Sequence, residues 1–452
     1  MSQEEAFEKF TTGMNLFITG PGGTGKTTLV HRMTDYLGSR NMSYKVCALT
    51  GCAAILLGTK ATTFHSWAGI GLAKGTIKDV MKTVLSNSFA ISRIKKTRVL
   101  FVDEISMMSK KLFDLFCEIV RHLNPSMQII FTGDFFQLPP VGNVREPDTS
   151  AFCFESEHWE SIFPIESHIE LTHIYRQNDP VYIELLQSVR RGCITEGQAD
   201  LLRGKVGTEP IATTEEVVSV VPPKLYAIKR QVDTHNYMAF AELEGDMQEY
   251  TYSTVTNLRA WVDTGVPIKK EILDMCARLS PPAREYELNN ILSIMNCREK
   301  LQLKVGCSVM LILNLDLENG LCNGTQGVVT GFNRLNEPLV KFNTGTLGTA
   351  APVTVSHHTW QSDTYPTLGI RMMPLILSWA VTIHKIQGAT LESAVMDLGN
   401  TVFEYGQMYV ALSRVKSLDG LYLEGFNHKK IKANPKVIEF YETLFNAQLD
   451  NP

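Results

Sequence analysis

The stretch Gly20–Thr27, which reads GPGGTGKT, decides the fold of this chain. The apolar run 14–19 precedes it, and the segment 28–33 that follows has the pattern of a helix. Strand, glycine-rich loop and helix in this order are the context that a G-x-x-x-x-G-K-[ST] phosphate loop requires. Its four glycines let backbone N–H groups turn toward a triphosphate without clashes from Cβ atoms. The stretch therefore predicts nucleoside triphosphate binding, although it does not say what the energy is used for.

The loop also assigns roles to its last residues. The helix start adds unpaired N–H donors and the positive end of the helix dipole. Lys26 is expected to reach the β- and γ-phosphates, and the Thr27 hydroxyl is expected to bind Mg²⁺. The predicted nucleotide-binding residues of this segment are Gly20, Pro21, Gly22, Gly23, Thr24, Gly25, Lys26, Thr27 and Thr28.

Length and composition describe a globular protein of more than one domain. The chain has 452 residues, 44% hydrophobic and 20% charged, so we expect about two to four domains. The net charge of −4 neither requires nor excludes nucleic acid, since a basic groove can lie on a neutral protein. The nine cysteines contain no C-x-x-C pair, which argues against zinc sites and disulfides. With no apolar run of membrane-spanning length and no signal peptide, we expect an intracellular, soluble protein; nucleus, mitochondrion and viral replication site stay open.

The order of apolar runs predicts an α/β fold. Runs rich in β-forming residues occupy 44–49, 98–102 and 127–132, and residues 110–123 carry apolar side chains at helical spacing. Strands separated by helices indicate a parallel sheet with crossover connections. A further helix is expected around 285–295.

A second α/β region begins with the strand-like run 224–228 and closes with 375–383. Between them, residues 305–360 consist of short β-rich pieces separated by Asn-Gly turns at 319–320 and 323–324. This pattern of short strands and tight turns predicts a small β-barrel inserted in the second α/β region.

An acid pair, Asp103 and Glu104, follows the apolar strand-like run 100–102. An acid at this strand end is placed to hold the Mg²⁺ that is bound through Thr27. A second acid beside it can orient the attacking water and accept its proton. Adjacent carboxylates are common on protein surfaces, but a pair that follows an apolar strand downstream of a phosphate loop indicates a catalytic site.

A glutamine follows the next strand, in the segment 131–140 that reads FTGDFFQLPP. Gln137 leaves the strand end beside the expected nucleotide, where its amide can sense the γ-phosphate by hydrogen bonding. A simple turn would explain the glycine and the prolines of this segment, but not the resemblance that follows.

The segment 133–141, GDFFQLPPV, together with 103–107, DEISM, resembles the PIF (petite integration frequency) family of DNA helicases. These are RecD-like members of helicase superfamily 1B. The resemblance covers about residues 3–425, and it recurs in family order at 48–54, 62–67, 152–156, 171–177, 303–311, 323–329, 379–388 and 407–414.

The resemblance implies an α/β fold with two RecA-like P-loop NTPase domains. A small wedge subdomain is expected in the first domain, and an inserted SH3-like β-barrel is expected in the second. The implied boundaries are 1–180 for domain 1A with the wedge-bearing insertion 1B at about 68–92, 181–305 and 373–452 for domain 2A, and about 306–372 for domain 2B.

The resemblance also gives roles to residues outside the phosphate loop. Gln3 falls where the family reads adenine, and Gly388 is implied to contact the nucleotide. Arg176 and Arg414 resemble two arginine fingers, which would stabilise charge on the γ-phosphate in the transition state. The predicted catalytic set is therefore Lys26, Asp103, Glu104, Gln137, Arg176 and Arg414. The implied DNA contacts, through phosphate hydrogen bonds and base stacking, are Thr50, Gly51, Phe64, His65, Thr382, His384 and Lys385.

Three features depart from the family pattern. Ile386 stands where the family usually has serine in its His-Lys-Ser-Gln-Gly motif, so the local DNA contact is expected to differ. The family's signature segment is shortened here to 117–128, which puts the recognition of special DNA structures in doubt. With almost no chain before Gln3 and a short tail after 407–414, we expect a near-minimal motor.

The residues themselves predict a P-loop ATPase with ATP and Mg²⁺ as cofactors. The resemblance implies an ATP-dependent 5′-to-3′ DNA helicase that moves on single-stranded DNA and unwinds duplex DNA. The expected partners are single-stranded DNA and its junctions with duplex DNA. No membrane partner is expected, and the motor is expected to be monomeric. Roles in replication, recombination, repair and telomere maintenance all fit.

Three alternatives stay open. A P-loop phosphotransferase would explain the phosphate loop, but not Gln137, Arg176 and Arg414. An ATP-driven switch, or a translocase that displaces proteins without unwinding DNA, would share most of the motifs. A RecD-type subunit of a nuclease complex is the third alternative, although the sequence contains no nuclease acid cluster.

Overall fold

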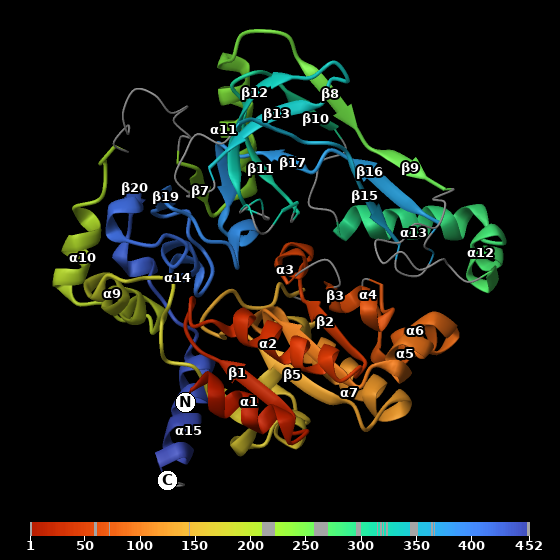
Figure 1. The fold of residues 1–452 in the computed structure, drawn as a ribbon. Coiled ribbons are helices and arrows are strands. Elements are labelled where there is room, and N and C mark those ends of the chain that lie inside the picture. Colours follow the sequence, from red (N-terminus) through yellow and green to blue (C-terminus); the bar gives the residue numbers. More distant parts are fainter. Residues whose placement is uncertain are drawn as a thin grey trace. The chain divides into compact units, whose positions relative to one another are not determined.

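The computed structural model describes most of the chain (Figure 1). The described residues are 2–57, 61–71, 73–143, 145–209, 222–256, 270–294, 300–313, 315–316, 319, 321, 324–343, 351–362, 365 and 367–449. They form two compact units: residues 2–209, 222–232 and 381–449 make up the first unit, and residues 233–380 make up the second.

The first unit contains a parallel sheet whose strand order is β3-β2-β4-β5-β1-β6. Its strands are β1 (Leu16–Thr19), β2 (Tyr44–Ala48), β3 (Thr62–Thr63), β4 (Val99–Asp103), β5 (Gln128–Thr132) and β6 (His168–Glu170). The strands predicted at 44–49, 98–102 and 127–132 are therefore confirmed, with ends that differ by one residue. Because parallel strands end at one edge, the loops after them open side by side.

Helices cover this sheet, as crossover connections require. They are α1 (Gln3–Thr11), α2 (Lys26–Ser39), α3 (Gly51–Leu56), α4 (Phe64–Ala68), α5 (Ile77–Ser86), α6 (Ser88–Lys96), α7 (Lys110–Leu123) and α8 (Trp159–Ile162). The helix predicted at 110–123 has these same bounds, because the Ser109 side chain caps its start by accepting from the Leu112 N–H at 3.3 Å. The predicted insertion at 68–92 contains α5 and part of α6.

The core of this sheet follows the two-residue period of a strand. In β1, the Phe17 ring points to one face, and its neighbours Leu16 and Ile18 point to the other. On the Phe17 face, buried aromatic rings gather around Phe131 and Trp159. Both faces of the strands are therefore buried, which leaves the strand ends as the place for polar chemistry.

The first unit also contains a second sheet, with the order β18-β7-β19-β20. Its strands are β7 (Lys224–Tyr226), β18 (Ala380–Thr382), β19 (Ala394–Leu398) and β20 (Leu421–Phe426), and β19 runs parallel to β7 and β20. Around them in sequence are α9 (Pro180–Arg190), α10 (Glu196–Arg203), α11 (Lys229–Glu242), α14 (Gln407–Leu412) and α15 (Pro435–Leu449). Two sheets with parallel strands and crossover helices confirm the predicted α/β class.

The second unit consists mainly of antiparallel sheets. Its largest described sheet has the order β14-β13-β12-β11-β17, and smaller ones join β10 to β8 and β15 to β16 and β9. The strands are β8 (Gln248–Thr251), β9 (Ser253–Val255), β10 (Lys300–Leu303), β11 (Ser308–Leu311), β12 (Gln326–Phe332), β13 (Pro338–Phe342), β14 (Val353–Thr354), β15 (His358–Gln361), β16 (Gly369–Met372) and β17 (Leu375–Leu377). The short β-strands predicted for 305–360 are confirmed, whereas β8, β9 and β10 were not predicted.

The second unit also contains the helices α12 (Lys270–Ala277) and α13 (Pro281–Ile294), together with residues 233–242 of α11. The helix expected around 285–295 is confirmed as α13, and it begins earlier because Pro281 suits the first turn, where no N–H donor is needed. Of the predicted Asn-Gly turns, Gly320 and Asn323 lie outside the described residues. The domain boundaries inferred from the sequence stay predictions.

Among the helices of the described residues, none combines the length and the apolar character needed to cross a bilayer.

The aromatic core of the first sheet gives a stability prediction. Phe131 is fully buried, and its ring centroid lies 4.9 Å from that of Phe163 and 5.7 Å from that of Phe116. Replacing Phe131 by alanine should lower the free energy of unfolding of this unit by about 3–5 kcal/mol, because a cavity remains. Val141→Ala, at a side chain that is 82% exposed, should change it by less than about 0.5 kcal/mol. Urea unfolding followed by circular dichroism measures both, and equal losses would contradict the packing described.

Candidate nucleotide-binding and DNA-contact site

The phosphate loop joins β1 to α2 at the carboxyl edge of the first sheet. Gly20, Gly23 and Gly25 have φ values of 139°, 86° and 79°, which L side chains rarely adopt. A Cβ atom on Gly20 would also lie 2.2 Å from the Leu171 carbonyl oxygen. The glycines are therefore required by backbone geometry and by close packing.

Lys26 lies inside this loop. Its Nζ donates to the carbonyl oxygens of Gly20 at 2.7 Å and Pro21 at 2.9 Å. Burial lowers the pKa of Lys26, and the carboxylates of Asp134, Glu104 and Asp103 oppose that shift. A desolvated ammonium group beside phosphate-facing N–H groups is suited to bind an anion.

Gln3, the predicted adenine-reading residue, lies against the loop from helix α1. Its Nε2 donates to the Thr24 carbonyl oxygen at 3.2 Å. A Cβ atom on Gly25 would lie only 2.5 Å from the same nitrogen. The structure thus places Gln3 beside Thr24 and Gly25, next to the start of α2.

The acid pair lies at the end of β4. Asp103 Oδ1 accepts from the Thr132 hydroxyl at 2.5 Å and from the Glu104 N–H at 2.8 Å, which orients the carboxylate. Glu104 has a φ of 56°, a left-handed conformation that a non-glycine residue adopts at a cost and that is found often at functional sites. Burial, together with the charge of Asp103, raises the pKa of Glu104 to about 7.

Gln387 joins the acid pair to the predicted phosphate sensor, and sequence reasoning missed it. Its Nε2 donates to Glu104 Oε2 at 2.9 Å and lies 3.4 Å from Gln137 Oε1. Its neighbour Gly388, which was predicted to contact the nucleotide, has a φ of 84°. The position of Gln387 between Ile386 and Gly388 in a matched motif was the available signal.

The two predicted arginine fingers lie at the mouth of the loop. A Cβ atom on Gly22 would be 3.5 Å from Arg414 Nη2 and 3.6 Å from Arg176 Nη1. Burial and the nearby Arg176 charge lower the pKa of Arg414, and burial lowers that of Arg176. Two desolvated like charges beside a phosphate loop are stabilised by an anion between them.

Tyr409 is a second residue that sequence reasoning missed. Its hydroxyl oxygen accepts from the Gly22 N–H at 2.8 Å, and the residue is 2% exposed. The available signal was its position in the 407–414 motif, five residues before Arg414.

The predicted DNA contacts lie on several elements of the first unit. The Thr50 hydroxyl accepts from the Ala53 N–H at 3.2 Å and so stabilises the start of α3, whose first residue is Gly51. Burial lowers the pKa of both His65 and His384, which favours the neutral form of each imidazole. Thr382 precedes the 3₁₀ turn Ile383–Ile386, which contains His384 and Lys385.

Phe64 differs from the other predicted DNA contacts. Its side chain is fully buried, with its ring centroid 5.8 Å from Trp67 and 5.6 Å from Phe116. It belongs to the hydrophobic core and cannot stack on a base in this conformation.

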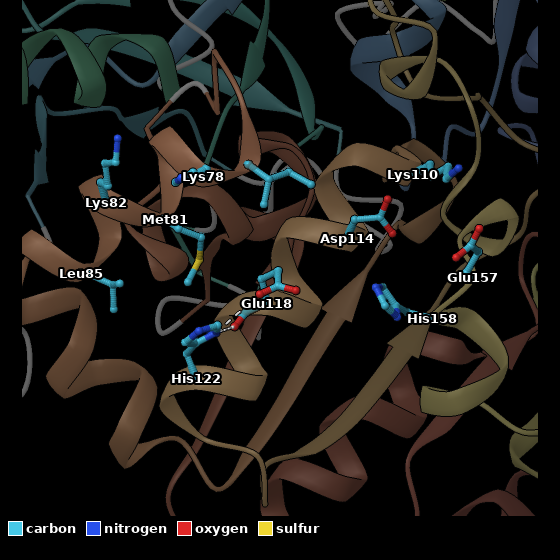
Figure 2. A pocket seen from close by; sticks show the side chains of 11 residues that line it. Lys78, Met81, Lys82, Leu85, Lys110, Asp114, Glu118, His122, Glu157 and His158 are labelled. Atoms are coloured by element: carbon cyan, nitrogen blue, oxygen red, sulfur yellow. Dashed lines mark hydrogen bonds and ion pairs between the residues drawn. The ribbon is translucent and has the colours of Figure 1, made fainter.

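Two cavities lie elsewhere in this unit. The smaller, about 240 Å³, is lined by His65, Pro140 and Val141 among others, so it reaches one predicted DNA contact. The larger, about 710 Å³, lies between α5 and α7, where Asp114, Glu118 and His122 project from α7 (Figure 2). None of the predicted nucleotide-binding residues lines either cavity.

The fold and the site together define a P-loop protein of the nucleotide-binding class with RecA-like sheets, in which two arginines lie beside the phosphate loop and an acid pair lies at the end of β4. Residues 2–199 match the family described as PIF1-like helicase, and residues 287–332 match the DNA helicase Pif1, 2B domain. The chain belongs to the PIF1-like helicase family.

Individual relatives agree with this assignment. The ATP-dependent DNA helicase PIF1 of Danio rerio is 33% identical over 97% of this chain, which spans 63% of that protein's length. The crystal structure of Pif1 helicase from Candida albicans is 32% identical, with a TM-score of 0.76 and coverage of 98% of this chain and 99% of that one. Bacteroides Pif1 bound to single-stranded DNA is 25% identical, with a TM-score of 0.66 and coverage of 99% and 98%.

The raised pKa of Glu104 gives a pH prediction. The carboxyl titrates near pH 4.5 when unperturbed and at about 7 in the folded protein, so the folded state binds more protons between these values. The free energy of unfolding should therefore fall as the pH rises through this window. Without nucleotide or Mg²⁺, the thermal midpoint of the wild type relative to Glu104→Gln should be higher at pH 5 than at pH 8. A pH-independent difference would contradict the burial of an ionisable Glu104.

Proposed function

We propose that this chain is an ATP-dependent 5′-to-3′ DNA helicase that moves on single-stranded DNA and opens duplex DNA. The observation that carries the proposal is the convergence of Lys26, Glu104, Arg176 and Arg414 on one phosphate loop. A P-loop phosphotransferase accounts for Lys26 but gives no role to His384 and Lys385, which the family resemblance implies as DNA contacts. The relatives named ATP-dependent DNA helicase, and the relative solved with single-stranded DNA, support the same activity.

ATP is proposed to bind with its adenine at Gln3 and its phosphates on the loop 20–28, beside Gly388. Mg²⁺ prefers oxygen ligands and is commonly held by one or two carboxylates together with substrate phosphates. The Thr27 hydroxyl and the Asp103 carboxylate, which two hydrogen bonds orient, fit that donor set. The bound metal ion would neutralise charge on the phosphates.

Hydrolysis is proposed to use Glu104 as the base that takes a proton from the attacking water. A carboxylate with a pKa of about 7 is a stronger base than an exposed glutamate, yet it is still ionised in part at neutral pH. Gln387 holds Oε2 of this carboxylate, and Gln137 lies within reach of the same amide. Arg176 and Arg414 would stabilise the charge that develops on the transferring phosphoryl group.

Movement along DNA is proposed to come from contacts that change with nucleotide state. Thr50, Gly51 and His65 form one set of DNA contacts, and the turn 382–385 forms another. Phosphate contacts of this kind tolerate any sequence and weaken with salt. Opening a base-pair step costs about 1.4 kcal/mol on average, so a motor that advances into frayed pairs needs little force per step. The domain limits 1–180, 181–305 with 373–452, and 306–372 are proposed as the mechanical units, with 68–92 as the wedge.

Two variants separate nucleotide binding from turnover. Glu104→Gln should keep ATP and DNA binding while lowering kcat for ATP hydrolysis by at least about a hundredfold, because the base is lost. Lys26→Ala should weaken nucleotide binding by about ten- to a hundredfold, because a charge-assisted contact is lost. Fluorescent-nucleotide titration and single-stranded-DNA-stimulated ATPase assays measure the two effects. Wild-type turnover in Glu104→Gln would refute the assignment of the base.

The direction of movement is tested with two partial duplexes, one with a 5′ single-stranded tail and one with a 3′ tail. With ATP and Mg²⁺, unwinding should occur only from the 5′ tail. Unwinding only from the 3′ tail would overturn the direction and leave a helicase. DNA-stimulated ATPase without strand separation would favour a translocase that displaces proteins, and ATPase indifferent to DNA would favour the phosphotransferase.

A further inference from the structure

A buried ion pair lies beside the nucleotide site and has no place in the proposed chemistry. Arg190, the last residue of α9, donates to Asp134 through Nε at 3.0 and 3.3 Å and through Nη2 at 2.9 Å. The Arg190 and Asp134 side chains are 3% and 0% exposed. Arg190 Nη1 also lies 3.6 Å from Glu170 Oε1. The guanidinium is therefore held from two sides by carboxylates.

Asp134 is also the residue that builds the turn bearing Gln137. Its carbonyl oxygen accepts from the Gln137 N–H at 2.9 Å, and its Oδ1 accepts from the Phe136 N–H at 3.2 Å. The carboxylate that anchors Arg190 thus also closes the turn 134–137. Any shift of Arg190 has to move this turn.

The C-terminal helix α15 holds the same turn from another direction. The Tyr441 ring stacks on Phe136 with centroids 4.9 Å apart and an interplanar angle of 12°. Its hydroxyl shares a 2.5 Å hydrogen bond with the Thr19 hydroxyl and accepts from the Phe135 N–H at 3.3 Å. Because Thr19 directly precedes Gly20, one phenol oxygen joins the phosphate-loop strand to the turn.

The turn is enclosed on its remaining sides. The Arg190 guanidinium carbon lies 4.6 Å from the Phe136 ring centroid and 5.4 Å from that of Tyr441. A Cβ atom on Gly406 would lie 2.3 Å from the Phe136 carbonyl oxygen and 2.6 Å from that of Gln137. The backbone that presents Gln137 has little room to relax.

Stability alone does not account for this arrangement. A buried ion pair costs desolvation and is commonly no more stabilising than apolar side chains of the same volume. A bidentate guanidinium pair does fix direction as well as distance. Its partner is the turn from which the phosphate sensor projects, so the gain is in the position of Gln137.

We propose that Arg190 and Tyr441 are positioning residues for ATP hydrolysis: they clamp the turn 134–137 against the phosphate-loop strand and so hold Gln137 at the nucleotide. The inference deepens the proposed function and rests on it. It also gives α15 a role in the motor, since Tyr441 is the contact through which that helix reaches Thr19 and Phe135.

The test compares three variants of the full chain in single-stranded-DNA-stimulated ATPase assays. Arg190→Lys keeps the positive charge but loses the planar guanidinium, whose Nε and Nη2 both donate to Asp134. Tyr441→Phe keeps the aromatic ring but loses the hydroxyl. Phe116→Leu is the control for lost packing, because Phe116 is fully buried in the same unit and its ring packs on those of Phe64 and Phe113 in the core of the first sheet. Thermal midpoints and nucleotide titrations are recorded for each.

Arg190→Lys should lower kcat by about ten- to a hundredfold, because a displaced Gln137 no longer has the geometry that the transition state requires. The KM for ATP should change by less than about twofold, as expected when ground-state binding is kept. Tyr441→Phe should lower kcat in the same direction by a smaller factor, again at constant KM. Phe116→Leu should lower the thermal midpoint while keeping the wild-type kcat.

If the wild type hydrolyses ATP and Tyr441→Phe has the same kcat, the inference is overturned. The Tyr441→Phe measurement gives this answer even if Arg190→Lys fails to fold. Loss of kcat in proportion to thermal midpoint in all three variants would also overturn it, because the role would then be structural only. A wild-type protein without DNA-stimulated ATPase would instead overturn the proposed function.

Discussion

The carboxyl edge of the first parallel sheet is the constraint on which the rest of the structure depends. Its strands are buried on both faces, so polar chemistry is confined to the loops where they end. Parallel strands end at one edge, which brings the phosphate loop after β1, the acid pair after β4 and the Gln137 turn after β5 together. Thr132, at the end of β5, hydrogen-bonds Asp103, at the end of β4, and thereby ties two of these loops to each other.

Desolvated charge follows from that placement. Lys26, Glu104 and Arg414 are close enough for the charge of Glu104 to influence the pKa of the two cations, and burial is the largest cause of the pKa shift of each. Such groups are costly to keep in the absence of a counter-ion. A triphosphate would supply charge opposite to that of Lys26 and Arg414, so the placement of these groups would favour nucleotide binding. Tyr409 and Gln387 then provide neutral hydrogen bonds that orient this arrangement without adding charge.

Local patterns predicted the first sheet well because each strand there is a continuous apolar run between turn residues. The same reasoning failed for β8 and β9, whose partners β10 and β16 lie far along the chain and whose own residues, apart from the buried Tyr250, are at least partly exposed. Within the site, most residues with a role in the family resemblance were predicted, whereas Gln387 and Tyr409 were missed although they lie in matched motifs. Asp134 lies in the matched segment 133–141 but was given no role. Arg190 and Tyr441 were not predicted, because an arginine at a helix end and a tyrosine near the end of a helix are ordinary surface residues until burial is known.

The sequence by itself determined the phosphate loop, the acid pair and the α/β order, since each depends on backbone demands and periodicities that residue types record locally. Gly20 and Gly25 are examples, because their positive φ values exclude other side chains. Only the tertiary structure decided that Phe64 lies in the core, that Gln387 holds Glu104, and that Tyr441 reaches Thr19. These outcomes depend on which side chains the packed chain removes from water and which distant atoms it brings within hydrogen-bond distance, and a linear sequence does not record either.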